Sequence, residues 1–136
     1  MDIEFVRINE EYDTDSFLCS SPQLTEYVKK FALPNDRMNI AKCILAIKDG
    51  IIVGYYTTSM KSVCKDDFEI KDVRGLPGYP IPIILIGKLA VHKDFAGQGI
   101  GSSILKSIFL LCLEKLLSVY SFNEMEGRTI VTATSI

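Results

Sequence analysis

Three glycines at alternate positions, Gly97, Gly99 and Gly101, mark the part of the sequence best suited to chemistry. An apolar run that reads as a strand precedes them, and a run with helical periodicity follows. Glycine lets the backbone approach a ligand closely and adopt angles that a side chain would forbid. A helix that starts here would direct its first unpaired N–H groups, and the positive end of its dipole, at the glycine loop. The stretch therefore predicts an anion site, most naturally for a phosphate.

The spacing of these glycines excludes two common phosphate-binding loops. The dinucleotide fingerprint G-x-G-x-x-G needs a glycine where this chain has Ser102, and a P-loop needs Gly-Lys-Ser/Thr at the start of the helix. The alternative is a strand-to-helix turn that binds nothing. We favour a binding loop because the flanking strand and helix patterns both fit it.

The stretch from Lys88 to Leu105 resembles motif A of the GNAT superfamily of N-acetyltransferases, Q/R-x-x-G-x-G/A. Gly99 and Gly101 match the glycines of the motif, whereas Ala96 stands at its Gln or Arg position, which we expect to weaken the site without abolishing it. The resemblance implies acetyl-CoA as the cofactor, with its pyrophosphate on the loop amides and its pantetheine arm on the preceding strand. The cofactor-binding residues implied in this way are Leu89, Ala90, Val91, Gly97, Gln98, Gly99, Ile100, Gly101 and Ser102.

Nearly the whole chain, residues 3–134, resembles the acetyltransferase toxins of bacterial type II toxin–antitoxin modules. The shared features are Phe17, Cys19 and Leu24 ahead of a helix, the GYYTTS of Gly54 to Ser59, and YPIPIILIGKLAV before the glycine loop. These toxins acetylate the α-amino group of aminoacyl-tRNA. The resemblance therefore implies an aminoacyl-tRNA acceptor and a small DNA-binding antitoxin as the partner.

Two departures from the toxin pattern affect the expected chemistry. The family continues past the strand at Thr129 with a further helix and two strands, and a tyrosine there serves as the general acid. No residue here matches that tyrosine, so the catalytic residues stay unassigned, and we expect a C-terminally truncated domain. Lys88 stands where the toxins carry arginine. Lys88, Tyr55 and Tyr56 are the candidates for the acceptor side, although strand alternation directs only one of the tyrosines there.

The single histidine, His92, is a tempting general base because imidazole titrates near neutral pH. It follows the strand directly, between the strand and the charged pair Lys93 and Asp94. This position favours a surface role. Four scattered cysteines (Cys19, Cys43, Cys64 and Cys112) with no C-x-x-C pair favour buried thiols over a metal site.

The composition, 48% hydrophobic and 24% charged, is typical of one globular domain, residues 1–136. A net charge of −2 argues against a generally basic nucleic-acid-binding protein. No apolar run reaches the roughly 18 residues of a membrane span. The acidic N-terminus lacks the regions of a signal peptide. We therefore expect a cytoplasmic protein that makes no membrane contact.

The glycine loop needs a sheet and helices to position it, and the hydrophobic periodicity of the sequence predicts both. The expected fold is α/β (α+β), a GNAT-like, mixed but mostly antiparallel sheet with helices packed on it, lacking the last helix and strands of the family. The first expected elements are a strand at Ile3–Ile8, a helix from Ser21-Pro22 to Pro34, and a hairpin of Ile40–Ile47 and Ile51–Val63 turning at Lys48-Asp49-Gly50. A surface loop at Cys64–Pro80 and a strand at Ile81–Val91 are expected next. The last are a helix from Gly101 to about Val119, a turn-rich link at Phe122–Arg128 and a strand at Thr129–Thr134.

Two other functions stay open on the sequence alone. The chain could bind CoA, or a protein partner, as a remnant of the GNAT fold without turnover, and the missing C-terminal segment favours that interpretation. Acetylation of a small amine or a protein N-terminus keeps the chemistry and changes the acceptor. A sheet that ends at Thr134 would leave an unpaired edge, which favours a homodimer.

Overall fold

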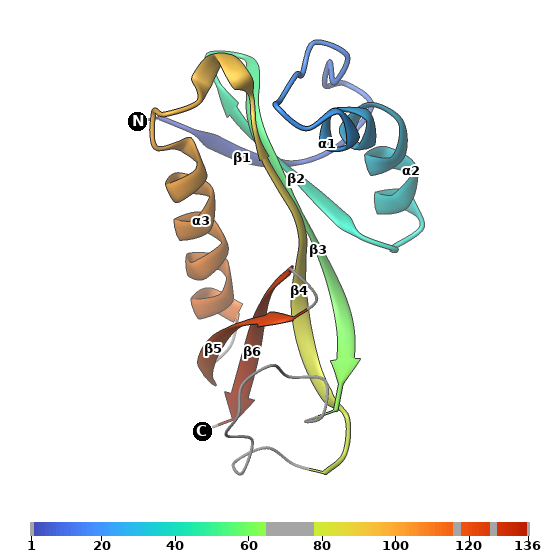
Figure 1. The fold of residues 1–136 in the computed structure, drawn as a ribbon, viewed down its shortest axis with the longest axis vertical. Coiled ribbons are helices and arrows are strands. Elements are labelled where there is room, and N and C mark those ends of the chain that lie inside the picture. Colours follow the sequence, from blue (N-terminus) through green and yellow to red (C-terminus); the bar gives the residue numbers. More distant parts are fainter. Residues whose placement is uncertain (1, 65–77, 116–117, 126–127, 136) are drawn as a thin grey trace.

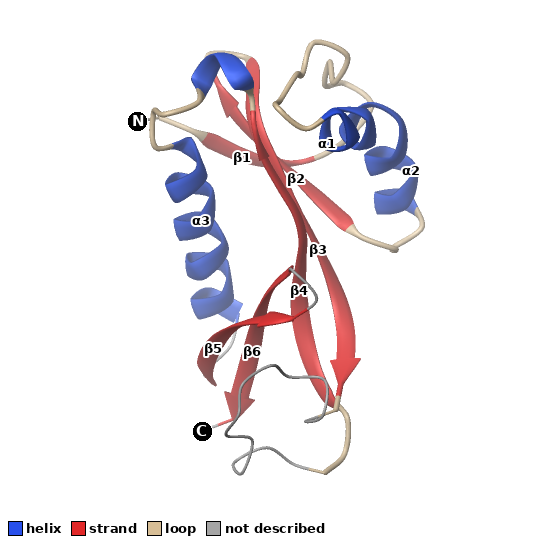
Figure 2. Ribbon diagram, in the orientation of Figure 1, coloured by secondary structure: helices blue, strands red, loops and turns tan. Residues whose placement is uncertain are grey.

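The computed structural model describes residues 2–64, 78–115, 118–125 and 128–135, which build one sheet with helices on both faces (Figures 1 and 2). The strands are β1 Glu4–Arg7, β2 Lys42–Lys48, β3 Ile51–Val63, β4 Ile81–Val91, β5 Ser118–Met125 and β6 Arg128–Ser135. They lie in the order β1-β2-β3-β4-β6-β5. All of these pairings are antiparallel. The expected mixed, mostly antiparallel sheet is confirmed in its antiparallel pairing and its packed helices, and no parallel pair occurs among the described strands.

The hairpin between β2 and β3 turns at the predicted residues. Asp49 and Gly50 both have positive φ angles, 52° and 78°. Two consecutive residues in this region make the type I′ turn, whose twist matches that of the flanking strands.

One helical segment follows the first strand and the loop after it. It comprises α1 Pro22–Glu26, the π-helical turn η1 Tyr27–Phe31 and α2 Ala32–Arg37. The predicted start is confirmed, because the Ser21 hydroxyl accepts a hydrogen bond from the Leu24 N–H at 3.3 Å and Pro22 occupies the first turn. The predicted end at Pro34 was wrong. The wide turn η1 lets a new α-helical segment begin at Ala32, so Pro34 lies in a first turn, where its missing N–H costs no bond.

The C-terminal part of the chain differs from the prediction. Helix α3 spans Ile100–Lys115 rather than reaching Val119, and the segment predicted as a link contains the second half of β5. The β-branched and aromatic residues after Lys115 (SVYSF) favour a strand over a continued helix. Strand β6 lies between β4 and β5, so the expected unpaired edge at Thr134 is wrong, and the described sheet has β1 and β5 as its edges.

The core consists of two clusters, one on each face of the sheet. The α1–α2 cluster contains Phe17, Cys19, Val28, Ala32, Cys43, Leu45, Tyr55 and Ala90 among its buried residues. The α3 cluster contains Ala46, Val53, Tyr56, Ile86, Ile100, Ile104 and Ile108. Figure 1 shows α3 along one face and α1–α2 on the other.

Some expectations about individual side chains were wrong or fall outside the description. The apolar side chains of Leu105 and Leu111 in α3 are exposed rather than packed in the core. Cys64 is exposed rather than buried, whereas Cys19 and Cys43 are buried as expected. The side chain of Cys112 and residues 65–77 of the predicted loop lie outside the described residues.

The described residues contain neither a helix that could span a membrane nor a cluster of metal ligands. None of their helices combines the length and the hydropathy needed to cross a bilayer. None of their His, Cys, Asp and Glu side chains gather in threes as a metal ion requires.

Candidate cofactor site at the end of strand β4

A β-bulge at Gly87 divides strand β4 into two parts. Thr57 pairs with Lys88 and Thr58 with Ile86, so Gly87 is the extra residue. The bulge resets the alternation of side chains, because Ile86 and Leu89 both pack in the α3 cluster although three positions separate them. Lys88 consequently leaves the α3 face, to which simple alternation from Ile86 would have directed it.

The part of β4 after the bulge leaves backbone groups unpaired on one side. The His92 N–H donates to the Val53 carbonyl at 2.8 Å. Because backbone groups point to alternate sides along a strand, the N–H and C=O groups of Ala90, two residues earlier, also face β3. The N–H and C=O groups of Leu89 and Val91 therefore point away from β3. Strand β6 pairs only with Ile83–Ile86, so no described strand covers them. Of the predicted strand residues, Leu89 and Val91 offer backbone groups to a ligand, whereas those of Ala90 face β3.

The glycine loop has the conformation that its sequence predicted. Gly97 and Gly99 both have φ of +79°, in the left-handed region that favours glycine. A β-carbon built on either residue would meet nothing within 4 Å, so the space beside the loop is open. The first backbone bond into α3 runs from the Ser103 N–H to the Gly99 carbonyl at 3.0 Å.

The strand end and the helix start lie side by side. A β-carbon on Gly101 would be 3.8 Å from Cγ2 of Val91, which is an ordinary contact distance. The amides of Ile100, Gly101 and Ser102 precede the first helical bond and face the loop, where the α3 dipole favours an anion. The loop thus offers amides for a phosphate within a few residues of the exposed backbone of Leu89 and Val91.

Gly54 brings α3 close to the sheet, and sequence reasoning missed it. A β-carbon there would lie 2.8 Å from the Ala90 carbonyl oxygen and 2.9 Å from Cδ1 of Ile104. A glycine inside a strand is the signal that could have found it, because it often marks a close backbone approach.

The two tyrosines proposed for the acceptor side lie in opposite core clusters, as strand alternation predicts. Tyr55 is 0% exposed and its hydroxyl donates to the Leu24 carbonyl at 2.6 Å. Burial raises the pKa of Tyr55, so this hydroxyl stays protonated. Tyr56 is 2% exposed and packs under α3. Both tyrosines are therefore part of the packed core in this structure.

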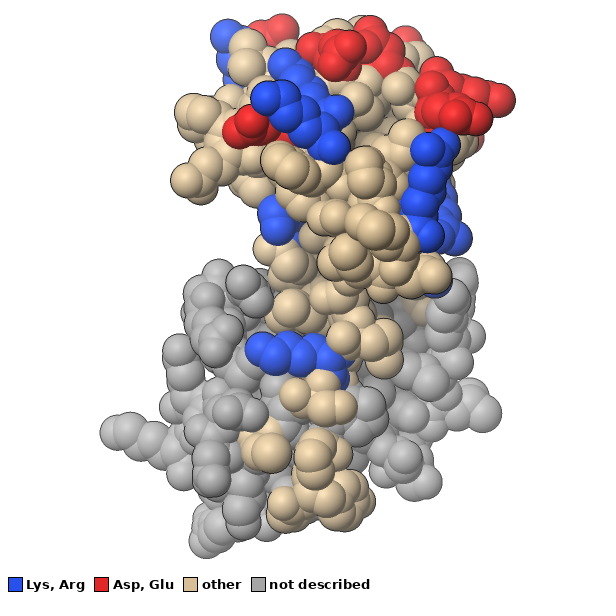
Figure 3. Space-filling view, turned by 90° about the vertical axis from the view of Figure 1, so that its right-hand side faces the viewer, with Lys and Arg blue, Asp and Glu red and all other residues tan. Residues whose placement is uncertain are grey.

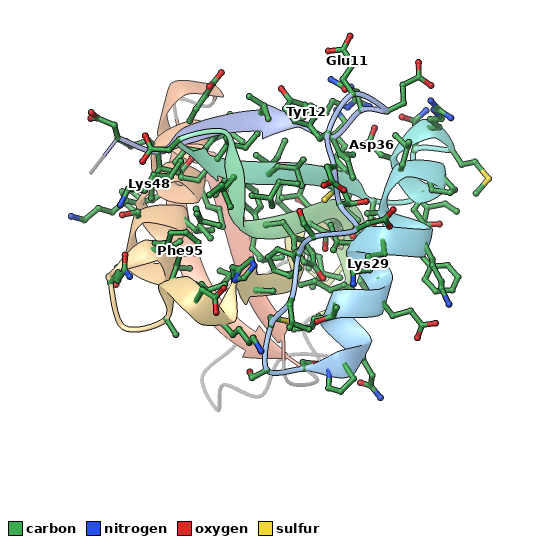
Figure 4. All side chains as sticks on the ribbon, turned by 90° about the horizontal axis from the view of Figure 1, so that it is seen from above. Glu11, Tyr12, Lys29, Asp36, Lys48 and Phe95 are labelled. Carbon is green, nitrogen blue, oxygen red and sulfur yellow. The ribbon has the colours of Figure 1, made fainter. Side chains whose placement is uncertain are left out.

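Lys88 and His92 lie at either end of the exposed β4 segment. The Lys88 ammonium lies 4.3 Å from the centroid of the Tyr27 ring, on the α1–α2 side of the sheet. His92 is only 8% exposed, so the expected surface position was wrong. Its ring lies edge-on to Phe17 and Phe95, which close over it. Figure 4 views this end of the molecule and labels Phe95.

A separate hollow of about 600 Å³ lies at the other end of α3. Its walls come from β1 to β4, the segment before β2 and the second half of α3. Its apolar lining includes Ile40, Ile44, Met60, Ile84, Ile108 and Leu111. No residue of the glycine loop lines it. The hollow is therefore distinct from the candidate cofactor site.

The chain is similar to known proteins in both sequence and fold. No family model matches the chain. A tRNA-acetylating toxin of Mycobacterium tuberculosis is 33% identical over 113 residues, which cover 83% of this chain and 68% of the relative.

Three solved structures share the fold at lower identity. A mutant of KacT superposes with a TM-score of 0.78 at 18% identity, covering 98% of this chain and 96% of that one. AtaT complexed with acetyl-methionyl-tRNAfMet superposes with a TM-score of 0.75 at 15% identity, covering 96% of this chain and 94% of that one. AtaTR bound with acetyl-CoA superposes with a TM-score of 0.70 at 18% identity, covering 98% of this chain and 94% of that one.

Proposed function

The chain belongs to the family of tRNA-acetylating toxins, N-acetyltransferases of the GNAT type, and we propose that it transfers the acetyl group of acetyl-CoA to the α-amino group of aminoacyl-tRNA. The observation that carries this proposal is the adjacency of two unpaired sets of backbone groups. One set is on Leu89 and Val91, and the other is at the start of α3, beside Gly97 and Gly99.

The residues present fit acetyl-CoA in charge and in shape. The amides from Gln98 to Ser102, together with the α3 dipole, would hold the pyrophosphate. The open space beside Gly97 and Gly99, where a β-carbon meets nothing, admits the phosphates close to the backbone. The exposed groups of Leu89 and Val91 would bond the pantetheine arm and orient the thioester carbonyl. Acetyl-CoA, when bound, supplies the activated acyl group.

The reaction forms one C–N bond and breaks one C–S bond. The neutral amine attacks the thioester carbonyl, CoA leaves as the thiolate, and the amine proton passes to water. An α-amino group has a pKa of about 8, so part of it is neutral near pH 7 without a protein base. The role of the chain is therefore chiefly to orient the thioester and the amine, an effect that can be worth several kcal/mol. His92 is not assigned as the base, because its Nδ1 already accepts the Asp94 N–H.

Lys88 is the residue that we assign to the acceptor side. It precedes the exposed β4 backbone directly, and the bulge turns it toward α1–η1, where its ammonium lies over Tyr27. A cation here can contact a phosphate of the RNA near the amine. As the antitoxin partner we propose a protein of the kind exemplified by AtaR, whose C-terminus is bound to AtaT in a solved structure.

The charge of the chain favours a second candidate acceptor, a small amine or a protein N-terminus. The net charge is −2, and on the face in Figure 3 basic and acidic side chains are mixed at the upper end, while the basic side chains of the described residues form no continuous patch. Arg7, Lys30 and Arg37 are also occupied in ion pairs. These three cations are thus less available to an RNA acceptor, whereas a small amine would need none of them.

Transfer from radiolabelled acetyl-CoA separates the candidates. The purified chain is incubated with aminoacyl-tRNA, uncharged tRNA, a polyamine or an unblocked peptide. Label on charged tRNA alone, released as the N-acetylamino acid by alkaline hydrolysis, is the expected result. Label on the polyamine or peptide alone would replace the RNA acceptor with the second candidate. Binding of acetyl-CoA without label on any acceptor would favour the remnant without turnover and contradict the proposal.

A further inference from the structure

His92 joins the two halves of the core at the end of the sheet. Its ring centroid lies 5.6 Å from that of Phe17 and 5.6 Å from that of Phe95, both edge-on, at 83° and 89°. Phe17 belongs to the α1–α2 cluster, whereas Phe95 packs against the α3 cluster. The imidazole therefore fills the gap where the strand leaves the sheet and the chain turns toward the glycine loop.

The polar groups of His92 hold that turn in place. Its N–H donates to the Val53 carbonyl at 2.8 Å, and its carbonyl accepts from the Phe95 N–H at 2.9 Å. Nδ1 accepts from the Asp94 N–H at 3.1 Å, so the side chain caps the short 3₁₀ helix η3, Lys93–Phe95. With Nδ1 as the acceptor of this bond, Nε2 is the ring nitrogen left to donate one.

The capped turn leads directly into the glycine loop. The Ala96 N–H bonds back to the Lys93 carbonyl at 3.4 Å, and Gly97 follows. The Lys93 N–H donates to the Leu18 carbonyl at 2.8 Å, which ties the turn to the N-terminal loop that also contains Phe17. The direction in which the loop amides approach a ligand is thus set at η3, and the η3 cap depends on one ring nitrogen.

We propose that His92 is a positioning residue for the glycine loop, which it holds in the geometry that binds the CoA phosphates. The inference rests on the proposed function, since the ligand of the loop is taken from there. His92 touches no reacting atom in this account. It acts through the hydrogen bond from the Asp94 N–H to Nδ1, with the ring contacts keeping the imidazole in place.

Two substitutions distinguish the effect of the hydrogen-bond acceptor Nδ1 from the effect of the aromatic ring. His92→Asn places a side-chain oxygen near the position of Nδ1 and is a favoured helix cap, but it removes the aromatic contacts. His92→Phe keeps an aromatic ring between Phe17 and Phe95 but has no acceptor for the Asp94 N–H. Val28→Ala, in the α1–α2 core and away from the loop, is the control for a simple loss of packing.

The dissociation constant for CoA is measured by calorimetry at a temperature where all four proteins are folded. We expect His92→Phe to weaken CoA binding about tenfold, in proportion to one lost, partly buried hydrogen bond. His92→Asn should stay within about threefold of the parent chain, and Val28→Ala should lower Tm while leaving CoA affinity unchanged. Parent-like affinity of His92→Phe, or equal losses in the Asn and Phe variants, would overturn the proposal.

Amide hydrogen exchange tests the same proposal without a ligand. Residues 94–101 should exchange faster in His92→Phe than in the parent chain, and the Asn variant should restore protection. Identical exchange in all three proteins would overturn the positioning role. If the parent chain binds no CoA, the proposed function fails, and the exchange data still decide whether His92 orders the loop.

Discussion

The ammonium nitrogen of Lys88 lies 4.3 Å from the centroid of the Tyr27 ring. The Tyr27 ring in turn stacks on Tyr55 at 6.4 Å and 15°, and its hydroxyl accepts a hydrogen bond from Asn35 at 3.2 Å. Lys88 reaches this aromatic pair only because Gly87 bulges out of β4 immediately before it. The bulge thus decides which face of the sheet receives the cation next to the exposed strand backbone.

Replacing Lys88 with methionine should affect the acceptor and spare the cofactor. The change removes the charge and keeps most of the aliphatic stem, and a partly exposed cation–π contact is worth only about 0.5–1 kcal/mol. We expect KM for aminoacyl-tRNA to rise about fivefold or more, since one phosphate contact is lost, with unchanged CoA affinity. Lys88→Arg should retain activity, and Lys48→Met in the β2–β3 hairpin region serves as the control. A loss of CoA affinity with an unchanged KM for the RNA would refute this assignment of Lys88.

Gly54→Ala should destabilise the fold at the contact between β3 and α3. The new β-carbon would lie 2.8 Å from the Ala90 carbonyl oxygen, a backbone atom that cannot rotate away. Overpacking of this kind costs about 1–3 kcal/mol, and we expect the free energy of unfolding in urea to fall within that range. Gly78→Ala is the control, because a β-carbon there meets nothing within 4 Å. Equal stability of the two variants would contradict the close approach of α3 to the sheet.

Alkaline pH should destabilise the chain through Cys43. Burial, aided by the nearby Asp36 charge, raises the pKa of the Cys43 thiol from 9.0 to about 12. Above pH 9 the unfolded chain therefore releases a proton that the native chain retains, so the free energy of unfolding falls as pH rises toward 12. One such group contributes a slope of up to about 1.4 kcal/mol per pH unit.

Urea unfolding at about pH 8, 9 and 10 measures this dependence. Cys43→Ala should reduce the decline between the upper two values, although the Tyr55 hydroxyl, whose pKa is also raised by burial, adds a decline of its own at higher pH. Parallel pH profiles for the parent chain and the variant would show that Cys43 does not cause the loss.

Local sequence chemistry predicted the parts of the fold that depend on single-residue conformations. The Asp49-Gly50 turn and the positive φ angles at Gly97 and Gly99 follow from what glycine and aspartate tolerate. The Ser21 cap is local in the same way. The candidate cofactor loop could be located for this reason before any tertiary contact was known.

The features that sequence reasoning missed depend on contacts between distant segments. The buried carboxylate of Asp36 accepts from the Arg7 guanidinium at 2.9 Å and from the Cys43 N–H at 3.0 Å, and neither partner is adjacent in sequence. His92 reads as a surface residue because charged residues follow it, yet Phe17, from a different part of the chain, covers its ring. The hydrophobic periodicity of a sequence does not predict such contacts.

The most direct test of the central claim is a calorimetric titration of CoA into the parent chain, Gly99→Ala and Gly50→Ala. The two glycines have nearly equal φ angles, +79° and +78°, and open space beside each, so alanine imposes the same backbone strain at both. Only Gly99 lies in the proposed phosphate loop. We predict micromolar CoA binding by the parent chain and by Gly50→Ala, much weaker binding of ATP, and a loss of about tenfold or more in Gly99→Ala. Equal CoA affinity of the two variants, or no binding by the folded parent chain, would contradict the account.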